Sequence, residues 1–293
     1  MEGFNPEKKE NYPTFDEQFA QKEKFELLGG EIEVVDIRPE NQKTDVPVVF
    51  APGWGETPET FRDSIRIMSE LERRVISLKH SRSGDKPEPK DEYPADELKK
   101  ALALLSILEN KNLTVIDAVA HSEGAINTCI AASLYPEKFR NIILVGPGGL
   151  IGEDKFLKLA GRFSQNIIRA ALEMLAKPET RLSLLKAGTE SAKYIMSNHY
   201  QALKEAIAIS ETEIYNMIKD LHQQGIGISV IHGVDDPVFP MGKMQETVKE
   251  DQIDGFYSVT GDHNEIYVHP EKYIPLVDEA LQALENKREQ NKK

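Results

Sequence analysis

The apolar residues of this chain gather into short continuous runs that are separated by longer amphipathic stretches. The runs predict strands at 25–28, 32–37, 46–51, 74–78, 113–119, 141–145, 228–231 and 256–259. Between most of them, apolar positions recur every three or four residues, which predicts helices. These helices are expected after Thr57, at 96–108, after Ser122, at 241–249 and at 270–285. Strands that alternate with helices are typical of a mostly parallel sheet covered on both faces, so the fold class is α/β.

Two departures from this alternation divide the chain. Gly29-Gly30-Glu31 separates the first two strands and predicts a hairpin. From 153 to about 224 only helical patterning is present, which predicts an all-helical cap over the carboxyl ends of the strands, where open α/β sheets bind ligands. The expected division is an N-terminal arm at 1–24, a core at 25–149 and 225–285, the cap at 150–224 and a charged tail at 286–293.

Composition and charge narrow the class of protein. The chain has 293 residues, a net charge of −13 and no basic block, so neither nucleic acid nor an anionic membrane surface is expected as a partner. No apolar run approaches the ~20 residues of a membrane span, and the polar N-terminus lacks the apolar core of a secretion signal. The cytoplasm is therefore the expected location. The single cysteine, Cys129, excludes an internal disulfide and is interpreted as a core residue. Nothing in the sequence predicts the oligomeric state.

The first sign of chemistry is the pentapeptide Ala120-His121-Ser122-Glu123-Gly124, which lies between the strand 113–119 and the helix that follows. A sharp turn from strand to helix needs small flanking residues, because the backbones approach closely there. The residue at the apex is then pushed outward in a strained conformation, and here it is Ser122. This is the pattern of a nucleophile elbow. An ordinary strand-helix turn with a surface serine is the alternative.

A serine nucleophile needs a base within hydrogen-bond reach. Of the seven histidines, His263 is the best candidate, because it follows the last predicted strand in a loop that Gly261 makes possible. The others stand in less suitable settings: His199 and His222 in cap helices, His232 at a strand end, His269 before a proline, His80 in a charged loop and His121 beside the serine itself. A loop histidine that fixes the next helix is the alternative for His263.

The base in turn needs a carboxylate that holds its tautomer. Asp235 and Asp236 both follow the strand 228–231, and the spacing Gly-x-x-Asp-x-x-x-Pro selects Asp236. Asp235 is expected to bond loop amides instead, as aspartates in turns often do. The resulting chain order of serine, aspartate and histidine is the order found in nucleophile-elbow hydrolases.

Acyl transfer also requires donors for the developing oxyanion. We expect the backbone N–H of Glu123, at the helix start, and the backbone N–H of Trp54, in the loop Gly53-Trp54-Gly55. The Trp54 ring is expected to wall the acyl pocket or to pack in the core. The Glu123 carboxylate would oppose an oxyanion, so its side chain is expected to point away, toward Arg82 or Arg62.

These motifs together resemble the α/β-hydrolase fold superfamily. The resemblance rests on Pro52-Gly53-Trp54-Gly55, the pentapeptide around Ser122, the segment 233–240 and Gly261-Asp262-His263, and it covers about 25–285. It implies an eight-stranded sheet, a helical cap and a Ser-His-Asp triad. The chain departs from the family pattern at Pro52, where histidine is common, and at Ala120, where glycine is usual, and neither change removes a catalytic group.

The expected activity is that of a serine hydrolase, a carboxylesterase that acts through an acyl-enzyme on a small ester-like molecule with no metal or organic cofactor. Cap side chains are expected to shape a largely apolar pocket: Phe163, Ile167, Leu172, Met174, Tyr194, Met196 and Tyr200. Thioesters, carbon–carbon bonds of diketones, peptide amines and perhydrolysis remain alternatives on the same triad. A ligand-binding or signalling protein of this fold is an alternative of another class.

Overall fold

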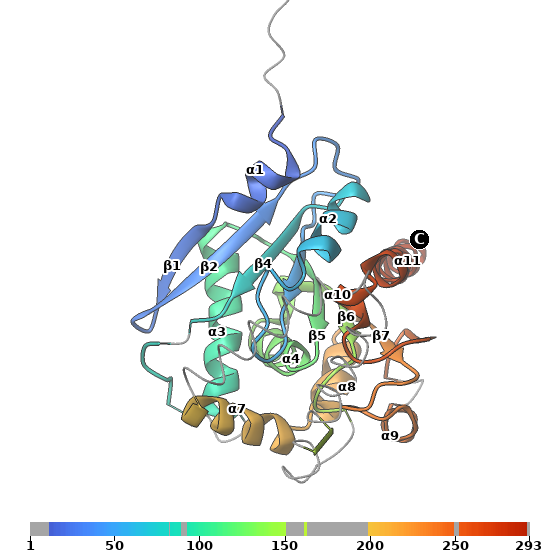
Figure 1. The fold of residues 1–293 in the computed structure, drawn as a ribbon. Helices are drawn as coiled ribbons and strands as arrows, with labels where there is room; N and C mark the ends of the chain where they lie inside the picture. Colours follow the sequence, from blue (N-terminus) through green and yellow to red (C-terminus); the bar gives the residue numbers. More distant parts are fainter. Residues whose placement is uncertain are drawn as a thin grey trace, which may run out of the picture.

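The computed structural model describes residues 12–81, 83–88, 93–150, 161–162, 199–248 and 252–291. Its centre is one eight-stranded sheet with the strand order β1-β2-β4-β3-β5-β6-β7-β8 (Figure 1). The strands are β1 Glu23–Leu27, β2 Gly30–Ile37, β3 Val48–Ala51, β4 Val75–Lys79, β5 Ile116–His121, β6 Phe139–Val145, β7 Gly227–Gly233 and β8 Gly255–Val259. Strand β2 is antiparallel to both of its neighbours, and all later neighbours are parallel. The predicted α/β class and eight-stranded sheet are confirmed.

Helices cover both faces of the sheet because successive strand residues point to opposite sides. In β3, Val49 and Ala51 belong to one apolar cluster, whereas Val48 and Phe50 belong to the other. The first cluster is closed by α3 Ala95–Asn110, α4 Gly124–Leu134, α8 Tyr215–Gln223 and α9 Met241–Thr247. The second is closed by α2 Arg62–Glu70, α10 Glu265–Val268 and α11 Pro270–Gln290. The central strands are therefore buried on both faces, as their continuous apolar runs predicted.

The N-terminal part carries more structure than the expected arm. Strands β1 and β2 form the predicted hairpin, with Leu27 opposite Gly30. Before it lies α1 Phe15–Ala20, which begins in a capping box between Thr14 and Glu17. Phe19 is buried in this helix, and the Arg62 guanidinium lies 5.2 Å from the centre of its ring. The buried Phe19 ring, the ion pair of Arg62 with Asp16 and hydrogen bonds from Tyr12 and Gln18 to the Arg38 carbonyl thus hold this segment on the core.

Two helix ends differ from the prediction. The helix expected after Thr57 begins only at Arg62, because the segment 57–60 folds into a turn in which the Thr60 N–H donates to the Thr57 carbonyl at 2.9 Å. At the other end of the chain, α11 continues through Gln290, so most of the expected charged tail is helical. Lys287 forms an ion pair at 2.6 Å with Asp254, which holds this last part of the helix.

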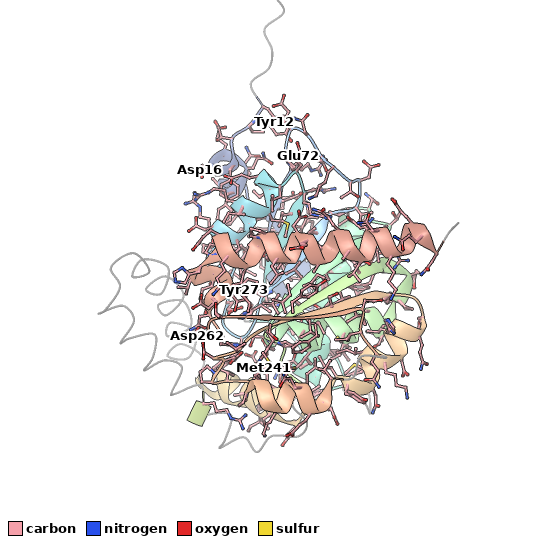
Figure 2. The ribbon with its side chains drawn as sticks, turned by 90° about the vertical axis from the view of Figure 1, so that its right-hand side faces the viewer. Tyr12, Asp16, Glu72, Met241, Asp262 and Tyr273 are labelled. Atoms are coloured by element: carbon pink, nitrogen blue, oxygen red, sulfur yellow. The ribbon has the colours of Figure 1, made fainter. Side chains whose placement is uncertain are left out.

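Helix α11 is joined to the first half of the sheet by a buried ion cluster. Arg73, whose side chain is fully buried, donates to Asp278 at 2.5 Å and to Glu285 at 3.0 Å on α11. Lys43 binds Asp278 from another side at 2.7 Å. Figure 2 shows α11 crossing one face of the molecule, with Tyr273 near its first turns. A buried guanidinium is tolerated only when carboxylates compensate it, so this cluster fixes α11 on the sheet.

The expected cap is described only in part. Helix α7 His199–Glu211 contacts α3, and it lies apart from the sheet in Figure 1. Helix α8 instead packs on α4 and β7 and buries Ile214, Ile218 and Leu221. The last part of the segment expected as cap therefore flanks the sheet, because its apolar stripe faces the core.

Candidate active site

The predicted site residues meet at one edge of the sheet. Strands β3, β5, β7 and β8 are parallel, and Trp54, Ser122, Asp236 and His263 each follow the end of one of them. Because the carboxyl ends of parallel strands share an edge, segments far apart in sequence converge there. Figure 2 shows Asp262, the neighbour of His263, at the same side of the molecule as Met241, where α9 begins.

Ser122 stands at the apex of a strained turn between β5 and α4. Its φ is 52°, in the left-handed region that residues other than glycine rarely adopt. Hydrogen bonds to β6 and its following loop stabilise this conformation: the Ser122 N–H donates to the Val145 carbonyl at 3.1 Å, and the Gly148 N–H donates to the Ser122 carbonyl at 3.0 Å. The hydroxyl is thereby presented at the edge where the strands end, as the elbow pattern predicts.

Gly124 is required by the close approach of this turn to β3. A Cβ added to Gly124 would lie 2.4 Å from the Ala51 carbonyl oxygen and 2.8 Å from that of Pro52. We therefore expect Gly124→Ala to lower the free energy of unfolding by about 1–3 kcal/mol, the usual cost of overpacking, as measured by urea denaturation. Gly242→Ala is the matched control, since its Cβ would meet no described atom within 4 Å and it lies in a helix. Equal stability of the two variants would contradict the prediction.

Ser122, His263 and Asp236 form a continuous hydrogen-bonded row. The Ser122 Oγ lies 3.0 Å from His263 Nε2, and His263 Nδ1 lies 2.8 Å from Asp236 Oδ2. An ionised carboxylate only accepts hydrogen bonds, so Nδ1 carries the proton and Nε2 presents its lone pair to the serine hydroxyl. The geometry is that of a nucleophile, a base and an orienting acid.

The electrostatics of the pair match this arrangement. Burial alone would raise the pKa of Asp236, but the neighbouring His263 and the amide of Phe239 outweigh burial and hold the pKa below its usual value. Burial alone would lower the pKa of His263, but Asp236, with smaller contributions from Glu56 and Asp262, raises the pKa above its usual value. The imidazolium that forms on proton transfer is thus stabilised by a carboxylate that stays ionised.

The loop after β7 fixes the carboxylate in place. Asp236 Oδ1 accepts from the amides of Val238 and Phe239, at 2.8 and 3.0 Å. His232 Nε2 donates to the Phe239 carbonyl at 2.7 Å, and burial lowers the pKa of His232, so its ring is neutral. Asp235 is exposed, and it is Asp236 that faces His263. The two adjacent aspartates thus have different surroundings, Asp236 beside the imidazole and Asp235 at the surface.

The loop after β3 lies against the serine. A Cβ on Gly53 would be 2.9 Å from the Cβ of Ser122, which leaves room for glycine alone. The Gly53 N–H donates to Glu56 Oε2 at 2.5 Å, and the same oxygen lies 2.9 Å from His121 Nδ1. His121 Nε2 lies 3.0 Å from the carbonyl oxygen of His263. Glu56 and His121, which sequence reasoning did not assign to the site, therefore join this loop to the loop that carries His263.

The Glu123 carboxylate has a different partner from those expected. It lies 2.6 Å from the Lys100 ammonium group, on α3. Arg62 instead pairs with Asp16 at 2.8 Å, and Arg82 lies outside the described residues. Its charge is therefore compensated within a buried cluster that also includes Glu205. The two partners are 23 residues apart, so no local pattern in the sequence indicates this pair.

Trp54 is half-buried, and its ring N–H donates to Glu205 Oε2 on α7 at 3.0 Å. The indole therefore connects the loop after β3 with the helix of the expected cap. The other expected pocket residues Phe163, Ile167, Leu172, Met174, Tyr194 and Met196, and the side chain of Tyr200, lie outside the described part of the chain.

The remaining candidates have ordinary surroundings. Cys129 is buried in α4, and burial raises the pKa of its thiol to about 12. His222 and His269 lie beside Asp254 and Glu271. The described residues include no group of three or more His, Cys, Asp or Glu side chains placed to hold a metal ion. In the same part of the chain, no helix combines the length and the apolar character needed to cross a membrane.

Comparisons with known proteins agree with this architecture. A family model described as the alpha/beta hydrolase fold matches residues 46–264. No curated protein sequence gives a significant match. Similar solved structures include a bromoperoxidase from Bacillus anthracis, with 18% identity, a TM-score of 0.66 and coverage of 89% of this chain and 100% of that chain. An esterase from Exiguobacterium antarcticum has 16% identity, a TM-score of 0.64 and coverage of 86% and 96%.

A mutant of a meta-cleavage product hydrolase (CumD) has 17% identity, a TM-score of 0.60 and coverage of 89% of this chain and 97% of that chain. At such identities the similarity to each of these structures shows the fold alone, and the substrates of these proteins do not transfer to this chain.

Proposed function

Because the chain belongs to the α/β-hydrolase fold family, we propose that it is a serine hydrolase that cleaves a carboxylic ester of a small molecule through an acyl-enzyme. The observation that carries the proposal is the row in which His263 Nε2 lies 3.0 Å from Ser122 Oγ and His263 Nδ1 lies 2.8 Å from Asp236. Proton transfer needs this kind of reach between nucleophile and base, and the base is held in the tautomer that accepts the proton.

In the proposed reaction, Ser122 Oγ attacks the ester carbonyl carbon while its proton moves to His263 Nε2. The negative charge that develops on the carbonyl oxygen is held by the backbone N–H groups of Trp54 and Glu123. Collapse of the tetrahedral intermediate breaks the carbon–oxygen bond, and the leaving alcohol takes the proton from His263. Water, deprotonated by the same imidazole, then attacks the carbonyl carbon of the acyl-enzyme. The bond from this carbon to Ser122 Oγ breaks, the serine oxygen takes the proton back from His263, and the acid is released.

Several features support these roles. The amide of Glu123 stands directly before α4, where helix N-terminal N–H groups favour negative charge. Gly53 packs on Ser122, so the next amide, that of Trp54, is within the loop that borders the nucleophile. The depressed pKa of Asp236 keeps it ionised near neutral pH, where the raised pKa of His263 makes it a stronger base.

The test is covalent labelling of the folded protein with a fluorophosphonate probe, followed by peptide mapping. We expect one adduct, on Ser122, and turnover of p-nitrophenyl esters whose rate depends on acyl length. The rates with other substrates distinguish ester cleavage from the other reactions of the same triad. These substrates are matched thioesters, aryl amides, peroxide with acetate for perhydrolysis, and a vinylogous diketone for carbon–carbon bond cleavage. Folded protein that gains no adduct at Ser122 would overturn the proposal and favour a ligand-binding role.

A further inference from the structure

We propose, on the basis of the serine hydrolase function above, that Lys100 is a positioning residue that holds the two oxyanion donors in place and compensates the charge of Glu123. It would act through the side chains of Glu123 and Trp54, whose backbone amides are the donors, and would not touch the substrate. Most buried residues of α3, such as Ala101 and Leu104, are apolar, and Glu97 is the charged residue among them.

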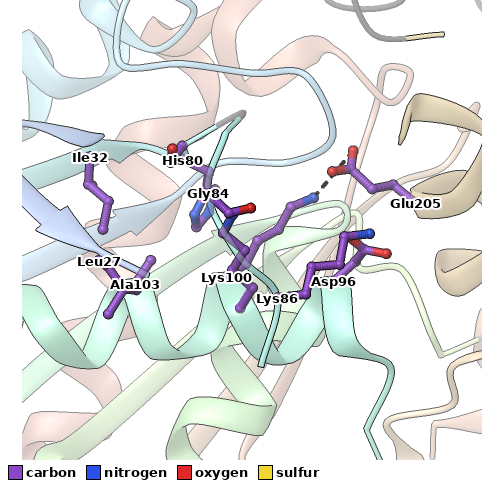
Figure 3. Close-up of a pocket in the computed structure, with 11 residues that line it drawn as sticks. Leu27, Ile32, His80, Gly84, Lys86, Asp96, Lys100, Ala103 and Glu205 are labelled. Carbon is purple, nitrogen blue, oxygen red and sulfur yellow. Dashed lines mark hydrogen bonds and ion pairs between the residues drawn. The ribbon is translucent and has the colours of Figure 1, made fainter. Parts of the chain in front are cut away.

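The contacts of Lys100 lead to both donor residues. Its ammonium nitrogen lies 2.6 Å from Glu123 Oε1 and 3.7 Å from Glu205 Oε2. That same oxygen of Glu205 accepts the Trp54 ring N–H at 3.0 Å. Figure 3 shows the Lys100 side chain extending from α3 toward Glu205. The Glu123 side chain therefore contacts the ammonium group directly, and the Trp54 ring is linked to it through Glu205.

The cluster is buried, so its charges act strongly on one another. The side chains of Glu123, Glu205 and Lys100 are 1%, 8% and 12% exposed. Burial opposes the charge of Lys100, but Glu123, Glu205 and Glu97 together outweigh burial and hold the pKa of Lys100 well above its usual value. Lys100 is therefore charged throughout the working pH range of a hydrolase.

A second buried glutamate, Glu97, adds to the negative charge that Lys100 compensates. Glu97, one turn before Lys100 on α3, is fully buried, and burial and the neighbouring Glu123 raise its pKa well above the usual value. Burial also raises the pKa of Glu123, but Lys100 counteracts burial there. Glu123, whose Oε1 lies 2.6 Å from the ammonium nitrogen, is the carboxylate that stands opposite Lys100.

The position of Glu123 shows why its charge must be compensated. Its own backbone N–H is a proposed oxyanion donor, so an uncompensated carboxylate on the same residue would oppose the negative charge of the tetrahedral intermediate. In a site shielded from water this repulsion acts in the transition state more than in the ground state, and therefore lowers kcat. Lys100 removes the repulsion without adding a group to the site.

The loop that carries Trp54 has empty space beside it. A cavity of about 70 Å³ is lined by His80, Lys100 and Glu205, among others (Figure 3). A smaller one of about 40 Å³ is lined by the same three residues together with Gly53 and Gly55. Both ring nitrogens of His80 are buried without a hydrogen-bond partner. On this side, the bond from Trp54 to Glu205, which faces Lys100, adds to the packing of the Trp54 ring against the apolar cluster.

The experiment compares Lys100→Met, Glu123→Gln and the double variant, with Lys99→Met as the matched control. Lys99 is the next residue on α3, but its ammonium group donates to the carbonyl oxygens of Ser83 and Gly84. The readouts are kcat and KM for a p-nitrophenyl ester, and the inhibition constant of an aryl trifluoromethyl ketone, whose adduct with serine carries the oxyanion.

For Lys100→Met we expect kcat to fall about 10²-fold, the loss typical of a disabled oxyanion donor, with KM changed less than about threefold. The trifluoromethyl ketone should bind more weakly by a similar factor. Adding Glu123→Gln to Lys100→Met should restore kcat by about tenfold, because the uncompensated charge is then gone. Lys99→Met should leave all three constants within about twofold of the original protein.

A Lys100→Met variant with unchanged kcat, or one whose loss is not relieved by Glu123→Gln, would overturn the proposal. Should Lys100→Met not fold, Trp54→Phe tests the contact with Glu205, since phenylalanine keeps an aromatic side chain but has no ring N–H to donate. We expect kcat to fall about fivefold, and an unchanged kcat would overturn the proposal. If the unaltered protein gains no fluorophosphonate adduct, the proposed function itself is rejected. If the unaltered protein is labelled but the variants give the negative results above, only the positioning role of Lys100 is rejected.

Discussion

Ser122→Ala is expected to lower kcat for ester hydrolysis by a factor on the order of 10⁶, and His263→Ala by about the same factor. Without the hydroxyl no acyl-enzyme forms, and without the imidazole the hydroxyl keeps its proton. Since the two groups act as one unit, the double variant should be no slower than either single variant. The measurement is kcat for a p-nitrophenyl ester, together with fluorophosphonate labelling, which Ser122→Ala should abolish.

Matched substitutions elsewhere control for effects on folding. Ser258→Ala changes an exposed serine of β8, and His269→Ala changes a histidine at the start of α11 that pairs with Glu271. Both should keep kcat within about twofold, because surface changes of this kind rarely shift stability by more than about 0.5 kcal/mol. Activity that survives in Ser122→Ala, with the circular dichroism spectrum unchanged, would show that another residue is the nucleophile.

Asp236→Asn is expected to lower kcat by about 10⁴-fold near neutral pH. Asparagine keeps the size of the side chain, but its NH₂ group can donate to His263 Nδ1, which would leave the proton on Nε2, where the serine hydroxyl needs an acceptor. Asp235→Asn is the matched control, since Asp235 is exposed and Asp236 is the residue within 2.8 Å of His263. Asp235→Asn should lower kcat less than about tenfold. A larger loss of kcat in Asp235→Asn than in Asp236→Asn would contradict the assignment of the acid.

The same variant predicts a change in the pH profile. Activity requires neutral His263, so kcat/KM should rise with pH through the pKa of this histidine. Asp236 raises that pKa above the ordinary value of 6.5, which places the acid limb of the unaltered protein above pH 6.5. In Asp236→Asn the carboxylate is gone while burial remains, so the limb should move to lower pH. A limb that stays in place would show that Asp236 does not set the pKa of His263.

Most of the sheet and the row of three side chains were predictable because their signals are local. Strands buried on both faces need continuous apolar runs, and each run from 46 onward became a strand. The turn at Ser122 needs small neighbours, and Gly124 fits against β3 with no room for a Cβ. Asp236 was selected by its spacing to Pro240. The loop between these two residues brings the amides of Val238 and Phe239 to the Asp236 carboxylate.

What was missed depends on contacts between distant segments. Lys100 and Glu123 are 23 residues apart, and neither helix pattern shows that the two side chains meet in a buried cluster. Glu56 reaches His121 across 65 residues, so its part in joining the two site loops has no local signal. Helix α10 has four residues, too few for an apolar period to be seen. The start of α1 was readable, since Thr14 and Glu17 have the spacing of a capping box.

The buried Arg73 has a consequence for the order of events during synthesis. Its carboxylate partners on α11 leave the ribosome more than 200 residues later, at separations of 205 and 212. Until then a nascent chain cannot enclose this guanidinium, because an uncompensated charge in the interior costs several kcal/mol. The native core therefore closes only after α11 has been synthesised, and the apolar strands of the first half stay incompletely covered until then.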